Sequence, residues 1–294
     1  MHHAGDLTNL LLGLAWYGEL SSDHIRRLWA PTDRTDCGVR RALSELRREG
    51  YASCRQWALP RPGGGPPQRQ PAVWALTPRG RELLVGHDLY PQRLFLPRAR
   101  RTLPHDAVTS EILTRLIELG RPAGLSGVYI EREVRIDLAR SRPVMDAIAV
   151  LRRGGGYDHP DLVPWSNDPL LPGERCRRYA IENDRDSEAI SVIVGKAYAY
   201  QAALTRDWAA RYGALPIPLW VVPSVRRRDA ILAAWRAAWP GGKWLITTDA
   251  DLHHDRWIGY HEGHTYERAL FAPRTDEDVA FPNTAHLYQG KVSR

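Results

Sequence analysis

Cysteine and lysine are both scarce in this sequence. Three cysteines occur among 294 residues, and no two of them form a Cys-x-x-Cys pair, which argues against a zinc ribbon and against a secreted disulfide framework. Lysine also occurs only three times, so 38 of the 41 lysine and arginine side chains are arginines. We attribute this arginine bias to genomic base composition rather than to function.

Long apolar runs and several catalytic motifs are absent as well. No stretch of 18 apolar residues occurs, and the N-terminus lacks a basic-then-apolar signal, so we expect a cytoplasmic location. The glycine-rich segments 62–67 and 152–156 lack the Gly-Lys-Ser/Thr of a P-loop, which leaves nucleotide binding unsupported. The histidines between positions 253 and 264 lack a His-Glu-x-x-His helix and a cysteine partner, which favours a surface cluster over a zinc site.

The overall charge and length allow a basic protein of one or two domains. The net charge is +7, and mild basicity of this kind suggests a polyanionic partner such as nucleic acid. A chain of 294 residues is long enough for one large domain or two modest ones. The first natural break lies at residues 86–104, where prolines and a basic run interrupt the periodic segments.

The first 90 residues have the pattern of helices followed by a hairpin. Apolar spacing and capping residues predict, in order, helices over 6–18, 21–30 and 35–50, strands over 51–59 and 72–76, and a short helix from Thr77. Three helices and a long-looped hairpin are the order of a winged helix-turn-helix. A small α+β domain without a nucleic-acid role is the alternative interpretation.

The placement of arginine favours the winged-helix interpretation. Between Gly50 and Arg81 the chain has arginines and no acid, and the third helix carries arginines away from its apolar stripe, although two glutamates partly offset them. A basic helix can lie in the major groove while a basic loop contacts backbone phosphate. We predict that DNA is contacted by Arg40, Arg41 and Arg47 of the helix and by Arg61 and Arg69 of the wing.

The remainder of the chain predicts a mixed sheet flanked by helices. Periodicity indicates a helix over 104–120, strands over 127–138, 143–151 and 178–184, a helix over 187–204, a strand over 216–224, a helix over 226–239 and a strand over 243–248. The predicted fold class is therefore α/β. We expect a winged helix-turn-helix over 1–90, a linker over 91–104 and a mixed-sheet α/β domain over 105–294.

Three carboxylates are expected to meet at one edge of this sheet. Asp146 interrupts the apolar strand 143–151, where an acid is costly unless it is paired, protonated or bound to metal. Glu182 and Asp184 are two residues apart on the next strand, so they point to the same face. If the two strands are neighbours, the three side chains converge, and hard divalent ions prefer such oxygen ligands.

Lys196 stands in the helix that follows this acidic cluster. At about 100° per residue, the sheet-facing side of the helix is defined by Ala189, Ile193, Ala197, Tyr200 and Leu204. Lys196 falls inside this arc, so we expect its ammonium to point toward the carboxylates. The alternative is that Lys196 snorkels to water from the edge of the apolar face.

The segments PVMDAIAVL, YAIENDRDSE and GKAYAY together resemble the replication-relaxation family of bacterial plasmid and mobile-element proteins. The family pattern has a histidine before the first helix of the second domain, then Pro-Asp-Ala, Glu-x-Asp-Arg and Lys-x-x-x-Tyr. This sequence supplies His105, Asp146-Ala147, Glu182 to Arg185 and Lys196 to Tyr200, with Met145 in place of the proline. The resemblance implies a winged helix joined to a restriction-endonuclease-like domain of the PD-(D/E)xK class.

The resemblance also implies chemistry at these positions. Asp184 stands where the PD-(D/E)xK motif ends in lysine, and Lys196 is a candidate for a catalytic lysine that has moved to the next helix. Asp146 and Glu182 would then hold Mg²⁺ or Mn²⁺, and Lys196 would steady the attacked phosphate, with Asp184 as a further ligand or orienter. The implied catalytic set is Asp146, Glu182, Asp184, Lys196 and Tyr200.

Two functions are consistent with this sequence. The first is a double-stranded-DNA-binding protein of replication, relaxation or maintenance of a plasmid or mobile element, with or without a metal-dependent nickase or nuclease activity. The second is a catalytically inactive winged-helix transcriptional regulator that uses its second domain for dimerisation or partner binding. Both place the protein in the cytoplasm, at the nucleoid or on a plasmid, and both are compatible with a homodimer.

Overall fold

The computed structural model describes eight stretches of the chain: residues 4–29, 36–59, 66–86, 103–123, 125–135, 144–153, 176–204 and 216–271. The wing arginine Arg61 and most of the expected linker lie outside these stretches. None of the helices in the described stretches combines the length and the apolar character needed to span a bilayer.

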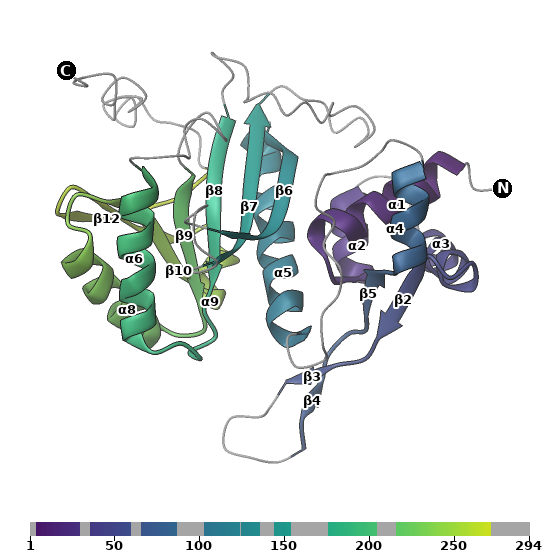
Figure 1. Ribbon diagram of the computed structural model, residues 1–294, viewed down its shortest axis with the longest axis horizontal. Coiled ribbons are helices and arrows are strands. Elements are labelled where there is room, and N and C mark those ends of the chain that lie inside the picture. Colours follow the sequence, from purple (N-terminus) through teal and green to yellow (C-terminus); the bar gives the residue numbers. More distant parts are fainter. Residues whose placement is uncertain are drawn as a thin grey trace.

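The N-terminal part contains helices around a small antiparallel sheet. Its elements are α1 (Ala4–Tyr17), β1 (Leu20–Ser21), α2 (Ser22–Trp29), α3 (Asp36–Arg48), β2 (Ala52–Arg55), β3 (Ala58–Leu59), β4 (Gln68–Arg69), β5 (Val73–Leu76) and α4 (Pro78–Gly86). The three-stranded sheet has the order β1-β5-β2, and β3 pairs with β4 in a separate hairpin. This hairpin projects away from the helices in Figure 1, as a wing does.

Local sequence signals fix the ends of these helices. The Ser21 hydroxyl accepts a hydrogen bond from the His24 backbone N–H (3.1 Å) at the start of α2, which is the role of an N-cap. Gly50 has a φ of 75°, which suits the C-cap position after α3, because glycine adopts this left-handed conformation without strain. The Thr77 hydroxyl accepts from the Gly80 N–H (3.1 Å), so the short helix is capped at Thr77, where it was predicted to begin, with Pro78 in its first turn.

The second part is built on one large sheet. Its elements are α5 (Leu103–Gly120), η2 (Arg121–Ala123), β6 (Leu125–Arg135), β7 (Val144–Arg153), β8 (Cys176–Asn183), α6 (Ile190–Leu204), β9 (Ile217–Val222), α8 (Val225–Ala238), β10 (Lys243–Thr248), α9 (Asp249–Leu252), β11 (Trp257–His261) and β12 (His264–Arg268). The strand order is β12-β11-β10-β9-β8-β7-β6. Strands β8, β9 and β10 run parallel, and every other neighbouring pair is antiparallel.

The hairpin of β11 and β12 was not predicted from the sequence. Its two-residue turn has positive φ at Glu262 (47°) and Gly263 (89°), the conformation of a type I′ turn. The signal in the sequence is a Gly-containing dipeptide between two strand-like runs. Two of the four expected surface histidines, His261 and His264, are cross-strand neighbours at this turn.

Helices cover both faces of the large sheet. In Figure 1, α5 lies between the sheet and the N-terminal helices, whereas α6 and α8 lie on the other face. The core under α6 and α8 contains tryptophans at positions 220, 235, 239 and 244, each at most 5% exposed.

One hydrophobic core runs through both parts of the chain. It includes Leu14 of α1, Leu43 of α3, Leu116 of α5 and Ala149 of β7. The predicted α/β class with a mixed sheet is confirmed. The division at residues 90 and 105, and the assignment of the two parts as a winged helix and a nuclease-like domain, stay predictions.

Candidate functional site at the ends of strands β7 and β8

Asp146 and Glu182 lie side by side on neighbouring strands. Ala147 of β7 is paired with Ile181 of β8 in an antiparallel ladder. Asp146, which precedes Ala147, therefore lies opposite Glu182, which follows Ile181. At this point the ladder ends, and the Asn183 backbone N–H donates to Asp146 Oδ2 at 2.6 Å. The predicted meeting of these two carboxylates at the edge of the sheet is therefore confirmed.

Glu182 is fully buried and accepts hydrogen bonds on both oxygens. Tyr200 donates its hydroxyl to Oε1 (2.8 Å), and Lys196 Nζ donates to Oε2 (2.8 Å). Lys196 is 7% exposed, and its Nζ also lies 3.1 Å from Glu188 Oε2 and 5.4 Å from the ring centre of Trp220. The predicted inward direction of Lys196 is confirmed, and the snorkelling alternative is wrong.

Burial and charge set the protonation of these groups. Burial raises the pKa of the Glu182 carboxyl to about 7, because the charge of Lys196 offsets only part of the cost of desolvation. Burial lowers the pKa of the Lys196 ammonium, but the charges of Glu182, Asp146 and Glu188 outweigh burial and hold that pKa above its usual value. Burial and the neighbouring Glu182 both raise the pKa of Tyr200, so its hydroxyl remains a donor.

His105 joins the site from the first turn of α5. Its Nε2 lies 3.2 Å from Asp146 Oδ1 and 3.1 Å from the Asn183 carbonyl, and its Nδ1 lies 3.7 Å from Asp106 Oδ1. Burial lowers the pKa of His105, but the two aspartates outweigh burial and raise the pKa to about 10. Burial raises the pKa of Asp146, yet the hydrogen bond and charge of His105 hold it below its usual value.

Asp184 belongs to a neighbouring ion pair rather than to the Lys196 cluster. Strand β8 ends at Asn183, and the carboxylate of Asp184 accepts a hydrogen bond from Arg227 Nε of α8. Arg227 also donates from Nη2 to the Glu188 carbonyl (2.5 Å). The expectation that Lys196 faces all three carboxylates is thus corrected: the chain turns at the end of β8, and Glu188 takes the place beside Lys196 that was expected for Asp184.

A divalent ion does not fit this arrangement without rearrangement. Each of the four carboxylate oxygens of Asp146 and Glu182 already lies beside a hydrogen-bond donor. Two of these donors are the cationic side chains of Lys196 and His105. Within the described stretches, no three His, Cys, Asp or Glu residues are grouped in a way that would hold a metal ion. The metal-ligand role of Asp146 and Glu182 therefore stays a prediction.

The predicted DNA-contacting arginines lie on exposed surfaces. Arg40, Arg41 and Arg47 are exposed on α3, and Arg69 is exposed on β4. Arg48 of the same helix lies beside an acid, with its Nε 3.1 Å from Glu49 Oε1.

Sequence reasoning missed the contacts made by Glu188, Arg227 and Arg185. Arg185 forms a two-pronged pair with Asp249, with distances of 2.6 and 3.0 Å. Glu188 was visible as a member of the acidic cluster, but its pairing with Lys196 was not. Arg227 follows Ser224, whose hydroxyl caps α8, so the cap signal predicts where the helix starts but not the acid that Arg227 meets.

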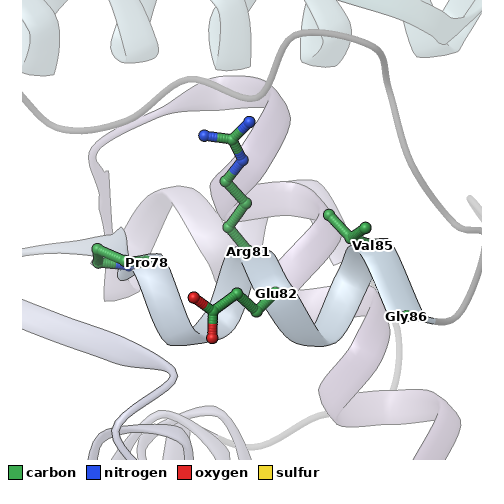
Figure 2. Close-up of a pocket in the computed structure, with 5 residues that line it drawn as sticks. All are labelled: Pro78, Arg81, Glu82, Val85 and Gly86. Atoms are coloured by element: carbon green, nitrogen blue, oxygen red, sulfur yellow. The ribbon is translucent and has the colours of Figure 1, made fainter.

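A shallow hollow on the outer face of α4 is separate from this site. It is lined by Pro78, Arg81, Glu82, Val85 and Gly86. Figure 2 shows that the Arg81 and Glu82 side chains leave the helix in different directions. The hollow thus brings together no carboxylate pair or nucleophile–base pair, and we assign it no chemistry.

Comparison with known proteins identifies one family. Residues 14–217 match a family model described as Replication-relaxation. No curated protein sequence matches the chain. A solved structure that matches is Bacillus subtilis PadR in complex with operator DNA, at 19% identity over 40% of this chain and 73% of the PadR chain. The TM-score of that match is 0.21.

Proposed function

The chain belongs to the replication-relaxation family, as the motifs implied, and from this premise we propose that it is a DNA-binding protein. Double-stranded DNA would be held by α3 and by the hairpin β3–β4, in the manner of a winged helix-turn-helix. The exposed arginines of α3 carry the proposal. In the described part of the chain, no carboxylate pairs with Arg41 or Arg47, so both guanidinium groups are available to phosphate.

The first experiment measures binding of the full chain to a labelled duplex. We expect Arg41→Gln and Arg47→Gln each to weaken binding on any duplex sequence, because phosphate contacts supply affinity without reading bases. Arg236→Gln is the matched control: Arg236 is also exposed and helical, but it lies on α8 in the other part of the chain. Equal losses in all three variants would attribute binding to net charge alone and would contradict a role for α3.

The second proposal concerns phosphodiester chemistry at the Asp146–Glu182–Lys196 site. Its support is the buried contact of Lys196 with Glu182 next to Asp146, the arrangement that the family resemblance assigns to a migrated catalytic lysine. Water would be the nucleophile in such a hydrolysis, and the leaving sugar oxygen would take its proton from solvent. His105 and Lys196 would hold a phosphate oxygen by charge, and Tyr200 would keep Glu182 in place through its hydroxyl hydrogen bond. Asp184 has a different task in this proposal, because it fixes Arg227 at the start of α8.

A plasmid assay separates this proposal from an inactive regulator. Supercoiled plasmid is incubated with the full chain with no added metal, with Mg²⁺ and with Mn²⁺, and relaxed and linear products are measured. A nuclease gives a product that depends on protein and is lost in Lys196→Met and in Lys196→Arg at a temperature where both variants remain folded. If wild type gives no product with either ion, catalysis is ruled out under these conditions, and the regulator interpretation is retained.

The biological setting belongs to the same proposal. A role in replication, relaxation or maintenance of a plasmid or mobile element follows from family membership together with DNA binding. A cytoplasmic location at the nucleoid or on a plasmid, and assembly as a homodimer, are expected on the same grounds. Fractionation of cell lysates into nucleoid-bound and unbound protein tests the location. Light scattering of the pure protein tests the homodimer.

A further inference from the structure

Helix α5 touches both the candidate site and the base of the wing with the same turn. His105 contacts Asp146, and the side-chain amide of Asn183 donates to the His105 carbonyl (3.0 Å) and to Thr109 Oγ1 (2.9 Å). Two residues after His105, Ala107 packs with Val73 of β5 and with Trp57, the residue just before β3. The base of the wing and the ends of β7 and β8 are thus separated by about one helix diameter, roughly 10 Å.

The wing is held firmly at this base. Trp57 donates its ring N–H to the Pro71 carbonyl (2.8 Å), and the Gln70 N–H donates to the Trp57 carbonyl (3.1 Å), so the two arms of the hairpin are joined at Trp57. In Figure 1 the hairpin extends past the lower end of α5, on the same side as the end of the sheet that carries the site.

The middle of α5 is clamped to α2 by a single arginine. Arg27 donates from Nη1 and Nη2 to Glu111 (2.7 and 3.0 Å) and from Nε and Nη2 to Glu118 (2.7 and 2.6 Å). His24 of α2 makes a second contact with α5, because its Nε2 lies 2.7 Å from Glu111 Oε2. A guanidinium fork that engages two carboxylates fixes direction as well as distance, and α2 in turn packs against α3.

The site is partly open to solvent. The His105 side chain is 36% exposed and that of Asp146 is 18% exposed, whereas Glu182 behind them is fully buried. The nearby loop after β8 is also open, since Ser187 is exposed. A phosphate that enters the site therefore meets His105 and Asp146 before Glu182.

We propose that the wing and the Asp146–Lys196 site contact one and the same DNA segment, and that Arg27 is the positioning residue that sets their spacing through α5. This inference rests on the proposed DNA binding. It assigns the site a DNA substrate or ligand that is already held by α3 and the wing, rather than a second, independent polyanion. Arg27 acts through Glu111 and Glu118 of α5 and is not itself required to touch DNA.

Proximity cutting by a tethered iron chelate tests the shared segment. The full chain is labelled at one cysteine at a time, with the other native cysteines replaced by serine. The positions are native Cys37, which is exposed on α3, Ser187→Cys beside the site, and Ala237→Cys. Ala237 is exposed near the far end of α8, about 15 Å along the helix from Arg227, and serves as the matched control. Strand breaks per bound duplex are measured, so no recognition sequence is needed.

The outcomes separate the inference from the function on which it rests. We expect comparable cutting from Cys37 and Ser187→Cys and little from Ala237→Cys. Cutting from Cys37 without cutting from Ser187→Cys overturns the shared segment and leaves DNA binding in place. No cutting from Cys37 overturns DNA contact by α3, and the inference fails with it.

The positioning role of Arg27 has its own readout. In Arg27→Met we expect cutting from Cys37 to persist while cutting from Ser187→Cys loses most of its yield, because α5 is no longer fixed to α2. If Arg27→Met does not fold, Glu118→Gln removes half of the clamp and is measured in its place. An unchanged ratio of the two yields in a folded variant overturns the positioning role, since a residue needed only for stability would not alter this ratio.

Discussion

Lys196 Nζ lies 2.8 Å from Glu182 Oε2 inside the protein, where the lysine is 7% exposed and the glutamate is fully buried. The two residues come from adjacent elements, the end of β8 and the second turn of α6. A buried pair of this kind contributes little net stability when both members are present, but it is costly to break. The stability of the fold and the proposed chemistry therefore both depend on the contact between Lys196 and Glu182.

Removing one member of the pair should destabilise the fold more than removing both. We expect Lys196→Met to lower the free energy of unfolding by about 3–5 kcal/mol, because Glu182 stays buried without its cation. The double variant Lys196→Met/Glu182→Gln should recover part of this loss. Denaturant unfolding of the two single variants and the double variant measures the coupling, and additive losses would contradict a direct interaction.

Glu19 should make the stability of the protein fall as the pH rises. Burial and the nearby Asp106 raise the pKa of the Glu19 carboxyl to about 7, although Arg132 and Arg55 lower it in part. The folded state thus binds a proton more tightly than the unfolded state, so the contribution of Glu19 is fully present below pH 4.5 and is lost as the pH rises through 7.

The variant Glu19→Gln removes this dependence. The free energy of unfolding of Glu19→Gln minus that of wild type should rise by up to about 3 kcal/mol between pH 5 and pH 8. Glu182 has a pKa shifted in the same direction, so the difference between variant and wild type, rather than the wild-type curve, is the informative quantity. A difference that does not change with pH would show that Glu19 ionises in the folded protein as it does in water.

Replacement of glycine by alanine should have opposite effects on stability at two positions. A Cβ on Gly80 would lie 2.3 Å from the Tyr51 carbonyl oxygen, a backbone atom that cannot move aside cheaply, so Gly80→Ala should destabilise by about 1–3 kcal/mol. A Cβ on Gly195 of α6 meets nothing within 4 Å, so Gly195→Ala should stabilise by about 0.5–1 kcal/mol. Thermal unfolding of the two variants side by side checks both signs, and stabilisation by Gly80→Ala would contradict the close packing of α4 on Tyr51.

Much of the fold and the direction of Lys196 were predictable because they depend on short-range periodicity. The 3.6-residue repeat of the α6 sequence placed Lys196 among the sheet-facing residues, and Ile193, Ala197 and Tyr200 are buried with it. Strands 143–151 and 178–184 follow one another in the predicted sheet, and their expected pairing brought Asp146 and Glu182 to one edge. Such signals need only the neighbours in the chain, so a single sequence contains them.

Most of the contacts that were missed join residues far apart in the chain. Arg27 and Glu111 are separated by 84 residues, and Arg227 and Asp184 by 43. No local pattern indicates which of 38 arginines meets a given acid, because side-chain pairing is decided only when the sheet and helices pack. Asp184 illustrates this: strand spacing put it beside Glu182, but the chain leaves β8 one residue earlier, and Arg227 captures it.

The most direct test of DNA binding through α3 is the salt dependence of binding by the full chain. We predict that the logarithm of the association constant falls linearly with the logarithm of salt concentration. The double variant Arg41→Gln/Arg47→Gln should reduce that slope by about 2, roughly one unit for each lost phosphate contact. The control Arg236→Gln should leave the slope unchanged. A flat response in wild type, or equal slopes for the double variant and wild type, would contradict the account.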